Sequence, residues 1–333
     1  MYKQTFGIIG LGKMGGNLAL QAIEKGYEVI GFDKQPGKDL LEREGIALTS
    51  SLEELVAKLP SPRIILLYVP AGEVVDVLLN QLSELVQKGD ILIDGGNSYW
   101  GDSIARYNRL KEKGVNFIDC GTSGGIDGAR NGACFMIGAE PEVAKSVSPI
   151  FKDLSVEGGF VYAGPPGSGH FVKLVHNGIE FGMLQAIGEG MHLLNHYKDK
   201  LNVLEILETW NHGSVIRSWL IELMAKVLKS EGGYENIPAY VEDTGEVNWL
   251  VNDAMRMEVP VPVIAQSVMQ LFASRDKELT WAKAIAMMRH GFGGHPFGPH
   301  DGIKYERQFG KLENANSANL YKTPGDGKES SLS

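Results

Sequence analysis

The sequence predicts an α/β domain over residues 1–168, followed by an all-helical domain over residues 169–333 that ends in an extended tail. Three observations support this prediction. Short apolar runs alternate with helix-period segments in the first half, strand signals nearly vanish after Phe171, and a Gly/Pro break at Ala163–Gly169 separates the two parts. Because apolar strands that alternate with helices form parallel sheets covered on both faces, we expect the first domain to be doubly wound.

Each expected strand is a short apolar run bounded by polar or turn residues. These runs are Phe6–Gly10, Glu28–Phe32, Arg63–Val69, Ile91–Asp94, Phe117–Cys120, Cys134–Ile137 and Phe160–Tyr162. Helix-period spacing of apolar residues is clearest in Asn17–Lys25, Val74–Val86, His170–His196 and Ser214–Ser230. From about Gly291 the chain is rich in Gly, Asn, Ser and Lys, which predicts a tail whose end, after Asn314, is disordered.

Length, charge and hydropathy exclude several classes of partner. The chain has 333 residues, of which 43% are hydrophobic, and a formal net charge of −9. Such an acidic protein is poorly suited to nucleic acid or an anionic membrane, and no apolar run reaches the roughly 18 residues of a membrane span. With no signal-peptide pattern and two cysteines, we expect a cytoplasmic protein. Local clusters of Lys and Arg still permit a small anionic substrate.

A glycine motif follows the first predicted strand. The segment matches G-x-G-x-x-G and consists of Gly10, Leu11, Gly12, Lys13, Met14 and Gly15. Gly10 permits a tight turn, Gly12 lets the backbone approach a pyrophosphate, and Gly15 permits close packing of the next helix. The free N–H groups at the start of that helix favour the phosphates. We therefore assign all six residues to a Rossmann-type dinucleotide site.

The second predicted strand ends near an acid that bears on the choice of cofactor. Asp33 is placed to accept hydrogen bonds from a ribose 2′-hydroxyl, and its carboxylate would repel the 2′-phosphate of NADP. Lys34 could partly accommodate that phosphate, so we expect NAD rather than NADP by a modest margin. The alternative that Asp33 only caps a turn stays open. We also assign Val69 and Pro70, where a later strand ends, to the cofactor site.

Four polar side chains lie on one face of the helix predicted over 170–196: Lys173, His176, Asn177 and Glu180. At about 100° per helical residue they fall within an arc of roughly 100°. Leu174, Val175 and Ile179 point away from this arc, toward what we expect to be packed core. An amine and a carboxyl on one rigid face could move protons in two directions on one substrate.

The commoner meaning of lysine and glutamate at such spacing is a solvated helix surface. Two features favour a site: His176–Gly178 has no use on such a surface, and a glycine inside a helix costs about 1 kcal/mol relative to alanine. His290, His295 and His300 are five residues apart in a Gly/Pro-rich segment. This spacing matches no standard zinc pattern, so we expect no metal.

Five segments together resemble one family of enzymes. They are Gly10–Gly15, Asp94–Ser98, Gly121–Arg130, Gly167–Glu180 and Arg289–His295. On these segments the chain is similar to the decarboxylating 6-phosphogluconate dehydrogenases of the shorter bacterial type, from Gly7 to about His295. The most specific part is Lys-x-x-His-Asn-Gly-Ile-Glu, because related β-hydroxyacid dehydrogenases share the lysine but not usually the glutamate.

The resemblance implies oxidative decarboxylation of 6-phosphogluconate to ribulose 5-phosphate and CO2 with reduction of NAD(P), in the pentose phosphate pathway and gluconate utilisation. It implies that Lys173 is the general base at the C3 hydroxyl and that Glu180 is the acid that protonates C1 of the enediol. Asn97 matches a residue between cofactor and sugar. The implied substrate contacts are Asn97, Ser123, Gly124, Gly125, His176, Asn177, Arg289 and His295. The last two match residues that enter a neighbouring subunit's site, so a homodimer is implied, and a state above the dimer is left open.

Three departures from the family concern the phosphate end of the substrate. Phe181 stands where a tyrosine is usual, Glu246 stands nearest to a lysine of longer members, and Arg275 is only the closest candidate for a third phosphate ligand. A weakened phosphate site leaves unphosphorylated sugar acids open as substrates. Two alternatives follow: a β-hydroxyacid dehydrogenase that does not decarboxylate, or a catalytically weak dinucleotide-binding sensor.

Overall fold

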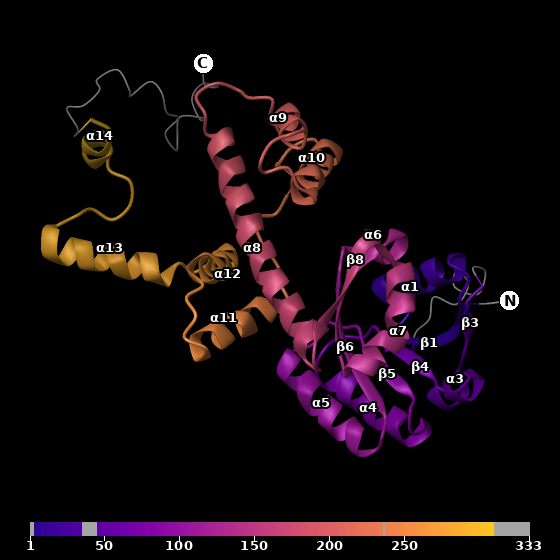
Figure 1. Cartoon of the computed structure of the whole chain (residues 1–333). Helices are drawn as coiled ribbons and strands as arrows, with labels where there is room; N and C mark the ends of the chain where they lie inside the picture. Colours follow the sequence, from indigo (N-terminus) through magenta and orange to yellow (C-terminus); the bar gives the residue numbers. More distant parts are fainter. Residues whose placement is uncertain (1–2, 35–44, 236, 310–333) are drawn as a thin grey trace. The chain divides into compact units, whose positions relative to one another are not determined.

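A computed structural model describes residues 3–34, 45–235 and 237–309 of the chain. The described residues form two compact units, both drawn in Figure 1. The sheet unit comprises residues up to 178 together with 245–258, and the helical unit comprises 179–244 and the residues from 259 on. The disorder predicted after Asn314 concerns residues outside those described.

The sheet unit is built on one sheet of eight strands, in the order β3-β2-β1-β4-β5-β6-β7-β8. The strands are β1 (Thr5–Ile9), β2 (Glu28–Phe32), β3 (Ala47–Leu48), β4 (Ile64–Leu67), β5 (Ile91–Asp94), β6 (Asn116–Ser123), β7 (Ala133–Gly138) and β8 (Ser155–Gly164). All seven predicted strands are confirmed, and the two-residue β3 is an addition. Strands β1 to β6 run parallel, as in the predicted doubly wound fold.

The far edge of the sheet differs from the parallel pattern. Strand β7 pairs antiparallel with β6, and β8 runs parallel to β7. The chain between β6 and β7 contains one short helix, α6 (Gly125–Asn131). A parallel return needs a crossover of a dozen or more residues, whereas an antiparallel partner can follow a short connection. The short connection is therefore consistent with the reversal of β7.

Helices cover both faces of the sheet. In this unit they are α1 (Lys13–Glu24), α3 (Leu52–Lys58), α4 (Glu73–Leu85), α5 (Trp100–Glu112), α6, α7 (Pro141–Leu154), the first part of α8 (Ser168–Asn195) and α11 (Glu246–Arg256). Successive strand residues alternate between two cores: Ile8 packs in the core with α1, α6 and α7, and Ile9 packs in the core with α3 and α4. Figure 1 shows these two groups of helices on opposite sides of the strands.

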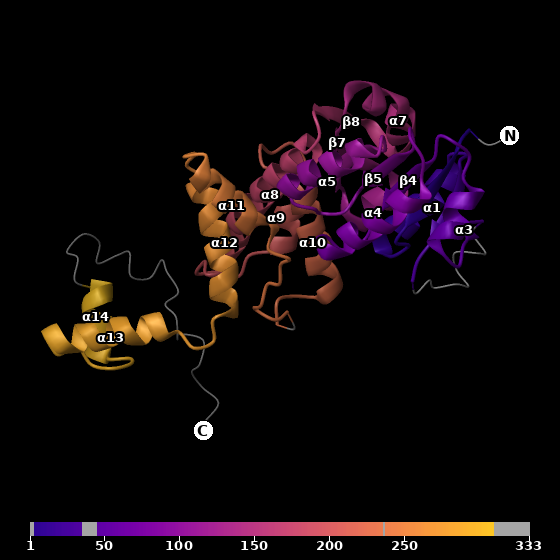
Figure 2. The same ribbon diagram turned by 90° about the horizontal axis from the view of Figure 1, so that it is seen from below.

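The helical unit contains the rest of α8 and five further helices. These are α9 (Val203–Trp210), α10 (Trp219–Glu231), α12 (Pro262–Arg275), α13 (Thr280–Gly293) and α14 (Asp301–Phe309). Helices α9 and α10 lie side by side (Figure 2), and Met191, Leu207 and Ile221 form a small buried cluster with them. Helix α10 begins later than the predicted residue 214, because the Ser218 hydroxyl accepts the Ile221 N–H and caps it.

Two features of the described residues complete the fold. The tail predicted from Gly291 is not extended throughout, since α13 continues to Gly293 and α14 lies within the tail. Among residues 3–34, 45–235 and 237–309, the structure has no helix with the length and apolar character that a membrane span requires.

Candidate active site

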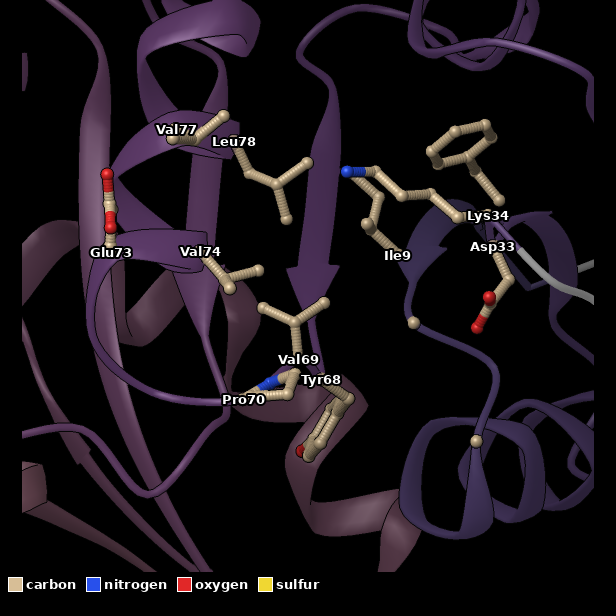
Figure 3. Close-up of a pocket in the computed structure, with 13 residues that line it drawn as sticks. Ile9, Asp33, Lys34, Tyr68, Val69, Pro70, Glu73, Val74, Val77 and Leu78 are labelled. Atoms are coloured by element: carbon tan, nitrogen blue, oxygen red, sulfur yellow. The ribbon is translucent and has the colours of Figure 1, made fainter.

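A cavity of about 460 Å³ lies where β1, β2 and β4 end and α4 begins. Its lining includes six residues assigned to the cofactor from sequence and a wall of aliphatic side chains from α4. The six are Gly10, Gly12, Asp33, Lys34, Val69 and Pro70, and the wall is Val74, Val77 and Leu78. Figure 3 shows Lys34 extending toward Leu78, while the Asp33 carboxylate points toward the glycine loop. The cavity has the size and the mostly apolar lining of a cofactor site.

The glycine loop is shaped for a close approach of backbone groups. Gly10 has φ +88°, and a Cβ on Gly15 would lie 1.9 Å from the Gly10 carbonyl oxygen. By contrast, a Cβ on Gly12 would meet nothing within 4 Å, so the loop is open at the glycine that precedes α1. An open glycine before a helix N-terminus is the arrangement that lets a pyrophosphate reach free N–H groups. The loop therefore fits a dinucleotide.

Asp33 has a contact within the protein as well as its place in the cavity. Its Oδ2 atom accepts the N–H of Leu11 at 2.7 Å and so ties the end of β2 to the glycine loop. Asp33 thus has a local structural role, of the kind that the turn-capping alternative describes, in addition to any role at a ribose. Lys34 is exposed at the rim of the same cavity.

A buried carboxylate organises the segment that carries Asn97. Asp94, at the end of β5, is 0% exposed, and it accepts the Gly96 N–H at 3.1 Å and the Ser98 hydroxyl at 2.7 Å. The buried Arg106 guanidinium donates to the same carboxylate at 3.2 Å, which compensates for its burial. These hydrogen bonds to the buried Asp94 therefore fix the conformation of the loop after β5.

Asn97 itself is exposed and meets a residue from the second half of the sequence. Its Nδ2 atom donates to Glu246 Oε1 at 2.9 Å, and Glu246 is the first residue of α11. The buried Asp253 of α11 accepts the Tyr99 hydroxyl at 2.8 Å and the Trp100 indole N–H at 2.7 Å. These two contacts fix α11 beside the Asn97 loop. The Glu246 carboxylate, one of the three departures named from the sequence, thus lies directly beside Asn97.

Helix α8 brings three of the predicted site residues into one hydrogen-bonded group. Lys173 and Asn177 are buried, and Lys173 Nζ donates to Asn177 Oδ1 at 2.6 Å. His176 Nδ1 lies 3.4 Å from Lys173 Nζ, and its Nε2 lies 3.1 Å from the Ser123 hydroxyl at the end of β6. Four predicted residues therefore form a continuous cluster from β6 to the α8 face.

The loop after Ser123 is built from two glycines. Gly124 has φ +116° and Gly125 has φ +60°, conformations that L-residues with a side chain rarely adopt. The loop leads directly into α6. It can present backbone N–H groups beside the Ser123 hydroxyl, which suits an oxygen-rich substrate.

Lys13 and Met14 begin α1 in the sheet unit, whereas the remaining predicted catalytic and substrate residues belong to the helical unit. Glu180 is half-buried and lies on the same helix as Lys173, about two turns later. Arg289 is exposed on α13, with Nη2 at 3.5 Å from His295 Nδ1. Ile179 is 54% exposed in this chain, so the expectation that it packs in a core is wrong.

Two of the departures at the phosphate end have a structural counterpart. The Arg275 guanidinium donates to Glu242 at 3.1 Å and lies 2.8 Å from an Asp243 oxygen, so it is already held by two carboxylates. Phe181 is half-buried and offers no hydroxyl. Neither residue therefore provides an evident phosphate contact in the described part of the chain.

Sequence reasoning missed residues that support the site from behind. Three of them are buried carboxylates that accept hydrogen bonds from backbone or side-chain groups around the predicted residues: Asp94, Asp119 and Asp253. Tyr68 lines the cofactor cavity with its hydroxyl 3.1 Å from Thr122, and burial raises the pKa of this tyrosine well above its usual value. The one sequence signal for such residues is a carboxylate inside an apolar strand, as in Ile118-Asp119-Cys120.

The chemistry of the site involves no evident metal ligand set. The described residues contain no group of three or more His, Cys, Asp or Glu side chains placed to hold an ion. The polar groups that converge are an amine, an imidazole, an amide and a hydroxyl, and they come from Lys173, His176, Asn177 and Ser123. Such a set can bind a hydroxylated substrate and exchange protons with it.

Comparisons with known proteins agree with this geometry. Residues 5–164 match the family described as the NAD binding domain of 6-phosphogluconate dehydrogenase, and residues 169–302 match the 6-phosphogluconate dehydrogenase C-terminal domain. The YqeC protein of Bacillus subtilis, a provisional 6-phosphogluconate dehydrogenase by name, is 43% identical over 87% of this chain and 97% of its own. The NAD(+)-dependent, decarboxylating 6-phosphogluconate dehydrogenase of Haloferax volcanii is 36% identical over the same shares of the two chains.

A solved structure extends the similarity to the fold. The 6-phosphogluconate dehydrogenase of Plasmodium falciparum, studied with NADP+ and with 6-phosphogluconate, superposes with a TM-score of 0.76 at 29% identity. The match covers 91% of this chain and 68% of that one. Together with an NAD(P)-binding sheet unit and the cluster around Lys173, these matches show that the chain belongs to the 6-phosphogluconate dehydrogenase family.

Proposed function

We propose that the chain catalyses the oxidative decarboxylation of 6-phospho-D-gluconate to D-ribulose 5-phosphate and CO2 with reduction of NAD(P), a step of the pentose phosphate pathway. The observation that carries this proposal is the cluster of Lys173, Asn177, His176 and Ser123 at the end of β6. A buried amine within hydrogen-bond reach of amide and imidazole groups is suited to proton transfer. A dinucleotide sensor would need no such cluster.

In the first step, Lys173 takes the proton from the C3 hydroxyl while hydride leaves C3. The nicotinamide cofactor supplies the hydride acceptor. The Asn177 carbonyl oxygen accepts from the Lys173 amine at 2.6 Å and so orients it. The ammonium that results donates a hydrogen bond to the new C3 ketone, which draws electrons away from the C1–C2 bond as CO2 leaves. One side chain thus serves both stages.

In the last step, Glu180 donates a proton to C1 of the enediol. Glu180 follows Lys173 by seven residues on α8, so both groups project from one helix face at the arc expected from the sequence. His176 and Asn177 lie between them and are suited to bind the sugar hydroxyls.

We propose NAD as the preferred cofactor. The support is the position of Asp33 at the end of β2, where a carboxylate accepts from ribose hydroxyls and repels a 2′-phosphate. Lys34, exposed at the same rim, offers that phosphate one cation. Gly10–Gly15, Val69 and Pro70 would hold the pyrophosphate and the neighbouring ribose. Parallel turnover measurements with the two cofactors test this, and a strong preference for NADP would contradict it.

We further propose that Arg289 and His295 act at the substrate phosphate of a neighbouring copy in a homodimer. Arginine binds phosphate through two parallel N–H groups, and His295 lies 3.5 Å from that guanidinium. The support for a second copy comes from α13. None of its residues is buried, and the apolar side chains of Trp281 and Met287 are 62% and 66% exposed. Such apolar exposure on one helix is typical of a subunit interface.

The decisive assay compares 6-phosphogluconate, gluconate and 3-hydroxyisobutyrate, with cofactor reduction and CO2 measured together. We expect 6-phosphogluconate to give the highest kcat/KM, with one CO2 released for each cofactor reduced. Cofactor reduction without CO2 would identify a β-hydroxyacid dehydrogenase. Equal turnover of gluconate would show that the phosphate contributes nothing, in line with Phe181 and Glu246. Absence of turnover with all three acids would leave the sensor as the better description.

A further inference from the structure

Asp119 is a carboxylate in the middle of an apolar strand. It lies on β6 between Ile118 and Cys120, and all three residues are 0% exposed. An ionised carboxylate in such surroundings is strongly destabilising unless hydrogen bonds compensate for the lost water. Accordingly, burial raises the pKa of Asp119, and the nearby His170 and the backbone N–H groups of His170 and Gly167 act against that rise.

The compensation comes from the N-terminal turn of α8. Asp119 Oδ1 accepts the Gly167 N–H at 2.6 Å, and Oδ2 accepts the His170 N–H at 2.8 Å. The first N–H groups of a helix have no partner within the helix, so a carboxylate there satisfies them and favours the positive end of the helix dipole. Both oxygens of Asp119 are therefore used to hold the start of α8.

Glycines let the backbone of α8 and β7 close around this carboxylate. A Cβ on Gly169 would lie 2.5 Å from the Asp119 carbonyl oxygen and 2.6 Å from that of Met136. A Cβ on Gly138 would lie 2.6 Å from Asp119 Oδ1. Because no side chain separates helix from strands here, small displacements of the carboxylate or of the first turn are opposed by hard contacts.

The same strand also receives the lysine. Lys173 follows His170 by three residues, nearly one helical turn, and a Cβ on Gly121 would lie only 2.4 Å from Lys173 Cβ. The stem of Lys173 therefore lies directly on β6, two residues from Asp119. Strand β6 positions α8 at two successive points, first through hydrogen bonds to its first turn and then through the lysine stem.

We propose that Asp119 is a positioning residue of the reaction: its carboxylate holds the first turn of α8 on β6 and thereby sets the place of the Lys173 amine. The kinetic consequence rests on the proposed function. A displacement of about 1 Å at a reacting group can lower the rate about 100-fold, so a loosened first turn acts on kcat. The proposed cofactor contacts of Gly10, Gly12 and Asp33 lie on other segments of the sheet unit.

The test is Asp119→Asn beside a matched control. An asparagine can accept a hydrogen bond from one of the two N–H groups, but its NH2 group is itself a donor and cannot accept from the other. Asp90 provides the control, because it is also 0% exposed and accepts two backbone N–H groups, from Arg63 at 2.7 Å and Gln87 at 2.9 Å. Asp90 precedes β5, which runs parallel to β6, so it lies at the end of these strands opposite to the Ser123 end, where the Lys173 cluster lies.

For Asp119→Asn we expect kcat to fall about 10- to 100-fold, with KM for the cofactor within about twofold of the parent. Asp90→Asn should keep the parent kcat even where its thermal stability falls by a similar amount. Equal kcat values for the two variants would overturn the proposal, because the effect would then be one of stability alone.

Two further measurements keep the result independent of folding and of the substrate. Gly121→Ala adds a Cβ that would lie 2.4 Å from Lys173 Cβ and 3.0 Å from the Gly169 carbonyl oxygen, so it displaces both the lysine stem and the first turn of α8 from β6. An unchanged kcat in this variant would also overturn the proposal. Amide hydrogen exchange over residues 167–173 needs no activity. It should be at least tenfold faster in Asp119→Asn than in Asp90→Asn. If the parent protein does not turn over 6-phosphogluconate, the proposed function fails. Equal exchange rates in the two variants are a separate outcome, which would show that Asp119 does not hold the first turn of α8.

Discussion

The sheet unit and the helical unit hold their parts of the proposed site in different ways. In the sheet unit, Lys173 and Asn177 are buried and hydrogen-bonded, and buried Asp94 and Asp119 support the segments that carry the site residues. In the helical unit, Arg289 is exposed on α13, a helix with no buried residue. The Lys173 cluster is therefore fixed by contacts within the sheet unit, whereas the proposed phosphate ligand Arg289 lies on a helix that no described contact buries.

The electrostatics of the two parts differ in the same sense. Around Asp94 the carboxylates of the sheet unit are matched by the buried Arg106, so the network carries little uncompensated charge. Arg275 in the helical unit is paired with two acids, while the Arg289 guanidinium lies 3.5 Å from the His295 imidazole. An arginine beside an imidazole is better suited to bind an anion from outside than an arginine already paired with carboxylates.

The largest effect is expected at Lys173. Lys173→Met removes the proposed base from the buried cluster but keeps a side chain of similar length. General acid–base groups contribute about 10²- to 10⁴-fold, and this one acts in two stages, so we expect kcat to fall by about 10³-fold or more. Cofactor reduction followed by absorbance measures the loss. The control is Lys145→Met on the exposed side of α7, and a Lys173→Met rate close to that of the control would remove the lysine from the mechanism.

Glu180 should have a smaller and more selective effect. Glu180→Gln cannot donate the final proton, so turnover should slow by about 100-fold, within the range for a general acid. Hydride transfer precedes that step and should survive. A rapid-mixing experiment should therefore show one equivalent of reduced cofactor formed quickly, before the slow steady state. If the variant and the parent share one steady-state rate, the acid must be another group.

Arg289 tests the exposed part of the site. A charge-assisted hydrogen bond contributes about 1.5–3 kcal/mol, so Arg289→Ala should raise KM for 6-phosphogluconate by about 10- to 100-fold. KM for gluconate should stay the same, because gluconate has no phosphate. Lys283→Ala, an exposed cation on the same helix α13, serves as the control for general charge. Equal effects on both acids would place Arg289 outside the phosphate site.

The parts of this molecule that the sequence could predict are those with local causes. Apolar runs predicted seven strands because successive side chains of a strand point alternately into two cores, so all of them must be apolar. Ile8 and Ile9 are an example. The polar arc of Lys173, His176 and Asn177 followed from helical period alone, and the hydrogen bonds among the three confirm that they share one face.

The parts that could not be predicted depend on partners distant in sequence. Asp253 meets Tyr99 and Trp100 from more than 150 residues away, so α11 joins the sheet unit although it lies between helices of the other unit. Asp119 and His170 are 51 residues apart, and no local pattern pairs them. Ile179 was expected in a core because it lies on the apolar face of the predicted helix. Helical period alone does not specify what covers that face, and Ile179 is 54% exposed.

The smallest effect is expected at an ion pair behind the Asn97 loop. Asp76 on α4 accepts from Arg106 at 2.8 Å and from Arg109 at 3.0 Å, and chiefly the Arg106 contact holds the pKa of Asp76 below its usual value. A carboxyl whose pKa is lowered by folding stabilises the protein above its unfolded pKa and loses that contribution as pH falls through the folded pKa. Because Asp76 is partly exposed, Asp76→Asn should lower the free energy of unfolding by at most about 1 kcal/mol at pH 7. Urea midpoints should show this difference shrinking as the pH falls below 4, while Asp199→Asn, at an exposed pair in the helical unit, should show none at either pH. A difference for Asp76→Asn that persists unchanged in acid would mean that the carboxylate charge is not what stabilises this part of the sheet unit.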